Sequence, residues 1–229
     1  MPRPLAATAA DRLAAVRSRI ARAARDAGRD PASVTIVAVS KTQTAEAIAE
    51  LIALGVDCFG ENRVQEAAAK WPALKAAHPG VALHLVGQLQ SNKAADAVAM
   101  CEAIHSLDRP SLVEALARAI DRAGRAPALF LQVNIGAEPQ KGGCAIGDTP
   151  ALLARARDAG LKVGGLMCVP PAGVEAAPYF ALLARMAGDL GLDWLSMGMS
   201  DDLEAAVMLG ATHVRPGSAL FGARPAPGP

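Results

Sequence analysis

Cysteine and histidine are both scarce in this chain of 229 residues, which contains four of each. The cysteines form no Cys-x-x-Cys pair and are far apart, at positions 58, 101, 144 and 168, so their spacing indicates neither a disulfide framework nor a zinc site. The histidines, at positions 78, 84, 105 and 213, also lack the spacing of metal ligands. We therefore expect reduced thiols and no metal centre.

Long apolar runs and an excess of charge of one sign are also absent. No apolar run reaches the ~20 residues that a membrane-spanning helix needs. Charges at Asp11 and Arg12 interrupt the N-terminal region before a signal-peptide core could form. With 23 basic and 22 acidic residues the net charge is +1, which gives no electrostatic footprint for nucleic acid or a membrane. We expect a cytoplasmic protein whose partner is a small molecule.

The sequence does contain a repeated alternation of short apolar runs with helical stretches, the pattern of parallel strands joined by crossover helices. Strands are predicted at 34–40, 56–59, 82–86, 103–106, 128–134, 162–168, 193–197 and 212–215. Helices are predicted between them at 44–54, 61–77, 91–101, 109–124, 149–159, 174–190 and 201–209. A further helix is predicted before the first strand, at 5–27, and a short terminal segment at 218–222.

This series favours an α/β fold, a single (β/α)8 TIM-type barrel with an extra N-terminal helix, over the alternative of an open doubly wound sheet. No linker divides the chain. Residues 1–229 are therefore interpreted as one barrel domain, and residues 224–229 as its Pro-rich tail.

Lys41 is the strongest candidate for chemistry, because it follows the apolar run 35–40 at the end of the first predicted strand. Reactive groups of such barrels lie at the C-terminal ends of the strands. Partial burial lowers the pKa of a lysine amine and makes its neutral form available for Schiff-base formation. The alternative is a lysine that extends from the strand end into water.

Two loops of small residues follow the seventh and eighth predicted strands. Barrels of this class commonly bind phosphate with these loops and the start of a short extra helix. Gly217 and Ser218 open such a segment, and Ser200 lies in the other loop. Asp201 and Asp202 would repel a phosphate near Ser200, so the residues alone favour Ser218. In the alternative interpretation both serines are ordinary helix N-caps.

Arg215 ends the eighth predicted strand, and Asn62 lies just past the second. Arginine stays charged and only donates hydrogen bonds, so an arginine that faces a pyridine nitrogen would keep that nitrogen unprotonated. The alternative for Arg215 is an ion pair with Glu61 or Asp201. Asn62 offers an amide to a ring substituent, and its alternative role is a cap.

Seven ordered motifs cover nearly the whole chain: VAVSK at 37–41, FGENRVQE at 59–66, HLVGQLQSNK at 84–93, QVNI at 132–135, GLMCVPP at 165–171, LSMGMS at 195–200 and ALFG at 219–222. Together they resemble the YggS/PROSC family of pyridoxal 5′-phosphate (PLP)-binding proteins, also called PLP homeostasis proteins. So many matches in order make the resemblance specific.

The resemblance implies a barrel like the N-terminal domain of alanine racemase, without a C-terminal β-domain, that holds PLP as a Schiff base on Lys41. It implies that Asn62 lies beside the ring and that Arg215 faces the pyridine nitrogen. Phosphate contacts are implied for Ser200, Gly217 and Ser218. Members of the family are regarded as carriers or regulators of PLP supply without established turnover, so no catalytic residue is implied. We expect a monomer whose partners are PLP and apo PLP-dependent enzymes.

Some positions depart from the family pattern. Pro216 stands where an aliphatic residue is common, and proline has no N–H to offer a phosphate oxygen. The 136–141 loop replaces a more serine-rich segment, and Gln88 stands where histidine is frequent.

The main alternative is an amino-acid racemase, which needs acid–base groups on both faces of the substrate. The resembling racemases take the second base from a tyrosine in or near an appended β-domain. The sole tyrosine, Tyr179, falls in a predicted helix, where packing is the favoured role, and only 11 residues follow Ser218. A third alternative, a phosphosugar-type barrel enzyme that uses the lysine, leaves the motifs unexplained.

Overall fold

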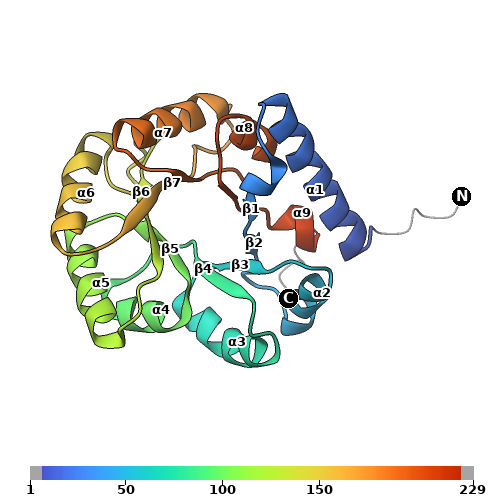
Figure 1. The fold of residues 1–229 in the computed structure, drawn as a ribbon, viewed down its shortest axis with the longest axis horizontal. Coiled ribbons are helices and arrows are strands. Elements are labelled where there is room, and N and C mark those ends of the chain that lie inside the picture. The colour runs from blue at the N-terminus through green and yellow to red at the C-terminus, as the bar shows by residue number, and fades with distance from the viewer. Residues whose placement is uncertain (1–6, 223–229) are drawn as a thin grey trace, which may run out of the picture.

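The computed structural model describes residues 7–222, in which strands and helices alternate around a ring (Figure 1). The strands are β1 (Thr35–Ile36), β2 (Ala38–Val39), β3 (Cys58–Glu61), β4 (Ala82–Leu85), β5 (Ala103–Leu107), β6 (Ala128–Val133), β7 (Val163–Cys168), β8 (Trp194–Ser196) and β9 (His213–Val214). The helices are α1 (Ala9–Asp26), α2 (Ala45–Ala53), α3 (Val64–Ala77), α4 (Ala94–Met100), α5 (Pro110–Ala123), α6 (Thr149–Asp158), α7 (Ala177–Asp189), α8 (Leu203–Met208) and α9 (Ser218–Phe221).

β1 and β2 are two parts of one barrel strand that is interrupted at Val37. β1 pairs in parallel with β9, and β2 pairs in parallel with β3. Hydrogen bonding continues through the interruption, because Val37 N–H donates to Val214 O at 2.8 Å. The strand order β1-β9-β8-β7-β6-β5-β4-β3-β2 is therefore that of a closed eight-stranded barrel. This confirms the predicted fold, and the doubly wound alternative is wrong.

Most element boundaries shift by one to three residues from the prediction. The predicted 61–77 helix begins only at Val64, because β3 continues as far as Glu61. The first helix begins at Ala9, where Thr8 and Asp11 form a capping box. Residues 5 and 6 of that predicted helix, and the predicted tail at 224–229, lie outside the described residues.

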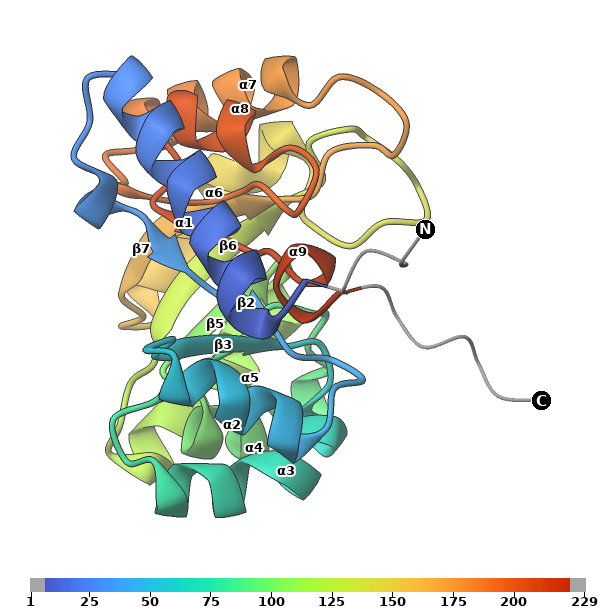
Figure 2. The same ribbon diagram turned by 90° about the vertical axis from the view of Figure 1, so that its right-hand side faces the viewer.

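α1 lies outside the ring, beside α8 and α9 (Figures 1 and 2). Arg19 Nε donates to Glu204 Oε1 of α8 at 2.6 Å, and Arg12 Nε donates to Leu220 O of α9 at 2.6 Å. The extra helix therefore fixes the two short helices that follow the last two strands. Its buried face supplies Leu13, Val16 and Ile20.

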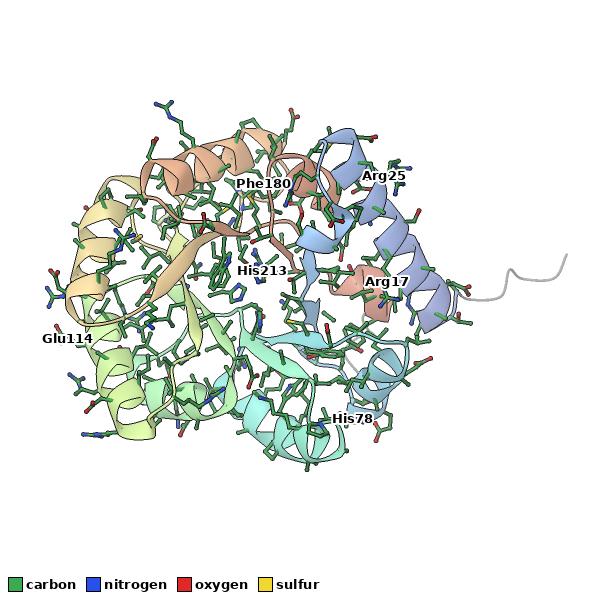
Figure 3. All side chains as sticks on the ribbon, in the orientation of Figure 1. Arg17, Arg25, His78, Glu114, Phe180 and His213 are labelled. Atoms are coloured by element: carbon green, nitrogen blue, oxygen red, sulfur yellow. The ribbon has the colours of Figure 1, made fainter. Side chains whose placement is uncertain are left out.

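Histidine and aromatic side chains fill part of the barrel interior, where Figure 3 shows His213 inside the ring. The ring of His105 stacks on Phe130 with a centroid distance of 4.2 Å, and the ring of His84 lies 5.1 Å from that of His105. Burial, reinforced by the nearby His213, lowers the pKa of His84 to about 4. Burial likewise lowers the pKa of His213 to about 4. These rings are therefore uncharged at neutral pH.

The four cysteines are buried free thiols, and burial raises the pKa of Cys101 and of Cys168 to about 12. Within residues 7–222 no three His, Cys, Asp or Glu side chains come together in a way that could hold a metal ion. In the same part of the chain, no helix has both the length and the apolar character that crossing a membrane requires.

Candidate functional site

A cavity of about 400 Å³ lies at the C-terminal ends of β2, β3, β8 and β9. All six residues that the sequence predicts for the site lie on its wall: Lys41, Asn62, Ser200, Arg215, Gly217 and Ser218. The fold thus brings these residues, which are distant in sequence, to one place.

Lys41 reaches the cavity from the end of β2. The residues before it are sealed in the barrel, since Val37, Ala38 and Ser40 have no exposed surface, whereas Lys41 itself is half-buried. Its side chain therefore starts at the boundary between the apolar core and the cavity, which is the environment that the sequence predicts. A primary amine at this position can act as a nucleophile toward a bound aldehyde.

Ser200, Gly217 and Ser218 form a cup of hydrogen-bonding groups on one side of the cavity. The Ser200 hydroxyl oxygen accepts hydrogen bonds from Gly217 N–H at 3.3 Å and from Ala219 N–H at 3.1 Å. The hydroxyl of Ser218 lies 3.1 Å from the same oxygen. Backbone N–H groups that converge in a turn are typical of anion sites, so this cup has the donors that a phosphate group requires.

Pro216 does not deprive the cup of its backbone donors. The carbonyl of Pro216 accepts a hydrogen bond from Val39 N–H at 2.9 Å, which ties this loop to β2. The two backbone N–H groups of the cup belong to Gly217 and Ala219. The proline therefore stands in the loop without occupying a donor position.

The two aspartates that follow Ser200 differ in their surroundings. Asp202 Oδ1 accepts a hydrogen bond from Met199 N–H at 2.6 Å, while Asp201 lies on the cavity wall. Arg19 Nη2 donates to Ser200 O at 2.9 Å and brings positive charge to the loop. Ser200 thus lies in the cup beside Ser218, although the residues alone favoured Ser218.

Arg215 extends from the end of β9 and is only 5% exposed. Its Nη1 donates to Ser196 Oγ at 2.6 Å and its Nη2 donates to Cys168 O at 2.8 Å, which fixes the guanidinium plane. Burial lowers the pKa of Arg215 from its ordinary value, but an arginine remains charged at any working pH. Glu61, one alternative partner, instead pairs with Lys70 at 2.8 Å. The predicted alternative of a Glu61 ion pair is therefore wrong.

Asn62 is half-buried on the cavity wall, and the loop after β4 packs directly on its backbone. A Cβ atom at Gly87 would lie 2.2 Å from Asn62 O and 2.7 Å from Asn62 Cα. Only glycine allows this approach, so Gly87 helps to place Asn62.

Sequence reasoning missed two parts of the site. The apolar wall is formed by Val39, Val86, Val169 and Met199. Val39, Val86 and Val169 could have been found, because they lie at or next to predicted strand ends. The groups that hold Arg215, which are the Ser196 hydroxyl and the Cys168 carbonyl, carry no sequence signal, because only the fold brings β7 and β8 beside that side chain.

The fold and cavity define a class of protein, a (β/α)8 barrel with a cavity at the C-terminal ends of its strands. The family model described as alanine racemase, N-terminal domain, matches residues 12–225. An alanine racemase from Clostridium difficile superimposes with a TM-score of 0.67 at 15% identity, covering 94% of this chain and 58% of that one. At this identity the likeness shows the fold alone.

Proteins of higher sequence identity to this chain define its family. The pyridoxal phosphate homeostasis protein of Pseudomonas aeruginosa is 44% identical over 95% of this chain and 96% of its own, and that of Escherichia coli K12 is 37% identical over 94% and 96%. PipY of Synechococcus elongatus, solved with PLP bound, superimposes with a TM-score of 0.83 at 40% identity, covering 94% of this chain and all of that one. This chain belongs to the pyridoxal phosphate homeostasis protein family, as its motifs indicated.

Proposed function

We propose that this chain holds PLP as a Schiff base on Lys41 and acts in PLP homeostasis as a carrier or regulator of cofactor supply. The observation that supports this most directly is the convergence of an amine, a buried guanidinium and a cup of hydrogen-bond donors on one cavity of about 400 Å³. Binding of PLP by PipY, which shares the fold at 40% identity, supports the same cofactor here.

The cavity residues fit the parts of PLP. The cup of Ser200, Gly217 and Ser218 would bind the phosphate, and the Asn62 amide would lie beside the ring. Arg215 can only donate, so facing the pyridine nitrogen it would keep that nitrogen unprotonated. When bound, PLP supplies an aldehyde with which the Lys41 amine can condense.

Within the described residues, the wall of this cavity does not include the tyrosine that the alternative, a racemase, would use as its second base. Among the described residues on its wall, the ionisable side chains are Lys41, Asp201 and Arg215. Tyr179 of α7 packs against the hydrophobic core and is not part of the wall. Racemisation uses two acid–base groups, each of which normally contributes ~10²–10⁴-fold. Because the tyrosine lies away from the wall, we assign no catalytic residue. We propose a cytoplasmic monomer that supplies apo-enzymes requiring PLP.

Wild-type protein loaded with PLP is expected to show no useful turnover of L- or D-alanine, serine or glutamate. Chiral chromatography and α-deuterium exchange would follow each amino acid, with Lys41→Ala as the blank. Turnover at the ~1–10³ s⁻¹ usual for enzymes would overturn the carrier proposal and favour the racemase.

Delivery of PLP is tested with the same PLP-loaded protein, mixed with an apo-enzyme that requires PLP and with a phosphatase that consumes free PLP. Activation of the apo-enzyme that survives the phosphatase supports protected transfer. Complete loss of activation restricts the role to storage.

Ser218→Ala is expected to weaken PLP binding by roughly ten- to hundredfold, because a lost hydrogen bond to a charged group costs ~1.5–3 kcal/mol. Binding of pyridoxal, which has no phosphate, should change much less. Titrations followed by absorbance would compare the two ligands, with Ser33→Ala, an exposed serine before β1, as the control. Equal weakening of both ligands would remove phosphate contact as the explanation.

A further inference from the structure

The turn that carries Lys41 is strained. Gln43 N–H donates to Ser40 O at 3.0 Å and closes a four-residue turn with Lys41 and Thr42 at its centre. Thr42 has a φ of 63°, whereas Lys41 is not among the described residues with positive φ. This combination is that of a type II turn, which favours glycine at the position of Thr42. A β-branched residue in the left-handed region is an outlier that persists only when its surroundings hold it there.

Two side chains of α3 hold this turn from outside the barrel. The Glu66 carboxylate accepts a hydrogen bond from Thr42 N–H at 2.5 Å. The Lys70 ammonium donates to Ser40 O at 3.0 Å and to Gln43 O at 3.4 Å, and it pairs with Glu66 at 2.9 Å. Both ends of the turn and its strained centre are therefore tied to one helix.

This arrangement is anchored in the core by Glu61. Its side chain has no exposed surface, and its Oε1 accepts hydrogen bonds from the Ser40 hydroxyl at 2.7 Å and from Trp71 Nε1 at 3.2 Å. The Lys70 ammonium lies 2.8 Å from the same oxygen. Lys70 is thus shared by two carboxylates, and its own side chain is only 15% exposed. A buried ion pair of this kind keeps its partners in place, because separating them would leave an uncompensated charge.

We propose that Glu66 and Lys70 are positioning residues that hold the strained turn and thereby fix where Lys41 enters the cavity. The inference rests on the proposed role of Lys41 as the attachment point of PLP. Without the contacts from α3, Thr42 relaxes to negative φ and the peptide between Lys41 and Thr42 rotates. The Cα atom of Lys41, from which the side chain extends, then moves.

Hydrogen exchange of the PLP-free protein tests the turn itself. Glu66→Ala removes the acceptor of Thr42 N–H and leaves the pair of Lys70 with Glu61. The matched control is Glu102→Ala, because Glu102 also accepts a backbone N–H, from Leu83 at 2.7 Å, and also pairs with a lysine, at 2.8 Å. Exchange of the Gln43 amide is expected to accelerate at least about tenfold in Glu66→Ala and to stay unchanged in Glu102→Ala. Equal exchange in wild type and Glu66→Ala overturns the proposal.

PLP titration tests the consequence for Lys41. Glu66→Ala should weaken PLP about tenfold, Glu66→Gln less, and Glu102→Ala not at all. Adding Thr42→Gly to Glu66→Ala should recover most of the affinity, because glycine adopts positive φ without strain. Equal losses in Glu66→Ala and Glu102→Ala, or no recovery with Thr42→Gly, contradict positioning and indicate a general loss of stability. If wild type itself fixes no PLP on Lys41, the proposed function fails, and hydrogen exchange alone decides whether α3 holds the turn.

Discussion

Lys41→Ala is expected to abolish the adduct that borohydride fixes between PLP and the protein. The reason is geometric: of the lysines in the described part of the chain, only Lys41 lines the cavity that also contains Arg215 and the cup around Ser200. Reduction with borohydride makes a Schiff base permanent, so mass spectrometry of the reduced protein would show one PLP per wild-type chain and none per variant chain. Peptide mapping of the wild type should place the modification on Lys41.

Lys141→Ala is the control for this experiment. Lys141 lines an adjoining cavity of about 240 Å³, which shares Asn62, Val86 and Val169 with the larger one. Its ammonium pairs with Glu138 at 2.5 Å and donates to Pro170 O at 3.0 Å. Lys141→Ala should therefore retain the adduct. A stoichiometric adduct in Lys41→Ala would show that Lys41 is not the attachment point of PLP. An adduct that maps to Lys141 or Lys93 in the wild type would show the same.

The sequence predicts the positions of the site residues because parallel strands of a barrel deliver their C-terminal ends to one face. Lys41 follows an apolar run and Arg215 ends a predicted strand, so their positions could be inferred from strand ends alone. The same logic fails where the backbone is irregular. The predicted strand 34–40 is one barrel strand, but its interruption at Val37 and the positive φ of Thr42 have no counterpart in the pattern of apolar residues.

The partners of buried polar groups could not be predicted, because they depend on which elements pack together. Glu61 is one of the carboxylates that the sequence offers as a partner of Arg215. In the structure Glu61 instead contacts Lys70 and Trp71 of α3, and Arg215 contacts Ser196. Burial favours hydrogen-bond partners for such groups, but the sequence does not say which neighbour supplies them.

A chain of close polar contacts runs from Arg215 into the histidine cluster. Arg215 donates to Ser196 Oγ at 2.6 Å, and the same oxygen lies 2.7 Å from His105 Nδ1. His105 Nε2 in turn lies 3.1 Å from His84 Nδ1. Burial holds the pKa of His105 well below its ordinary value.

Acid is expected to destabilise the protein well above the pH at which carboxylates titrate. An unfolded histidine has a pKa of about 6.5, whereas that of His84 is about 4 in the folded protein. At a pH between these two pKa values, His84 binds a proton in the unfolded state but not in the folded state. The contribution of His84 is thus complete above about pH 6.5 and is lost as the pH falls toward 4, by roughly 3 kcal/mol. His213, whose pKa is also about 4 in the folded protein, contributes a further loss of stability over the same pH range.

Urea denaturation between pH 7.5 and 4.5, followed by tryptophan fluorescence and circular dichroism, would measure this loss. The free energy of unfolding of the wild type should fall throughout the window. His84→Gln should be less stable than wild type at pH 7.5, because the hydrogen bond between residue 84 and His105 is weakened. It should nevertheless lose less stability on acidification, since a glutamine binds no proton. His213→Gln should flatten the profile in the same way while leaving the chain from Arg215 to His84 intact. A wild-type slope that survives unchanged in both variants would mean that other groups take up the protons, and that the histidines inside the barrel do not set its acid limit.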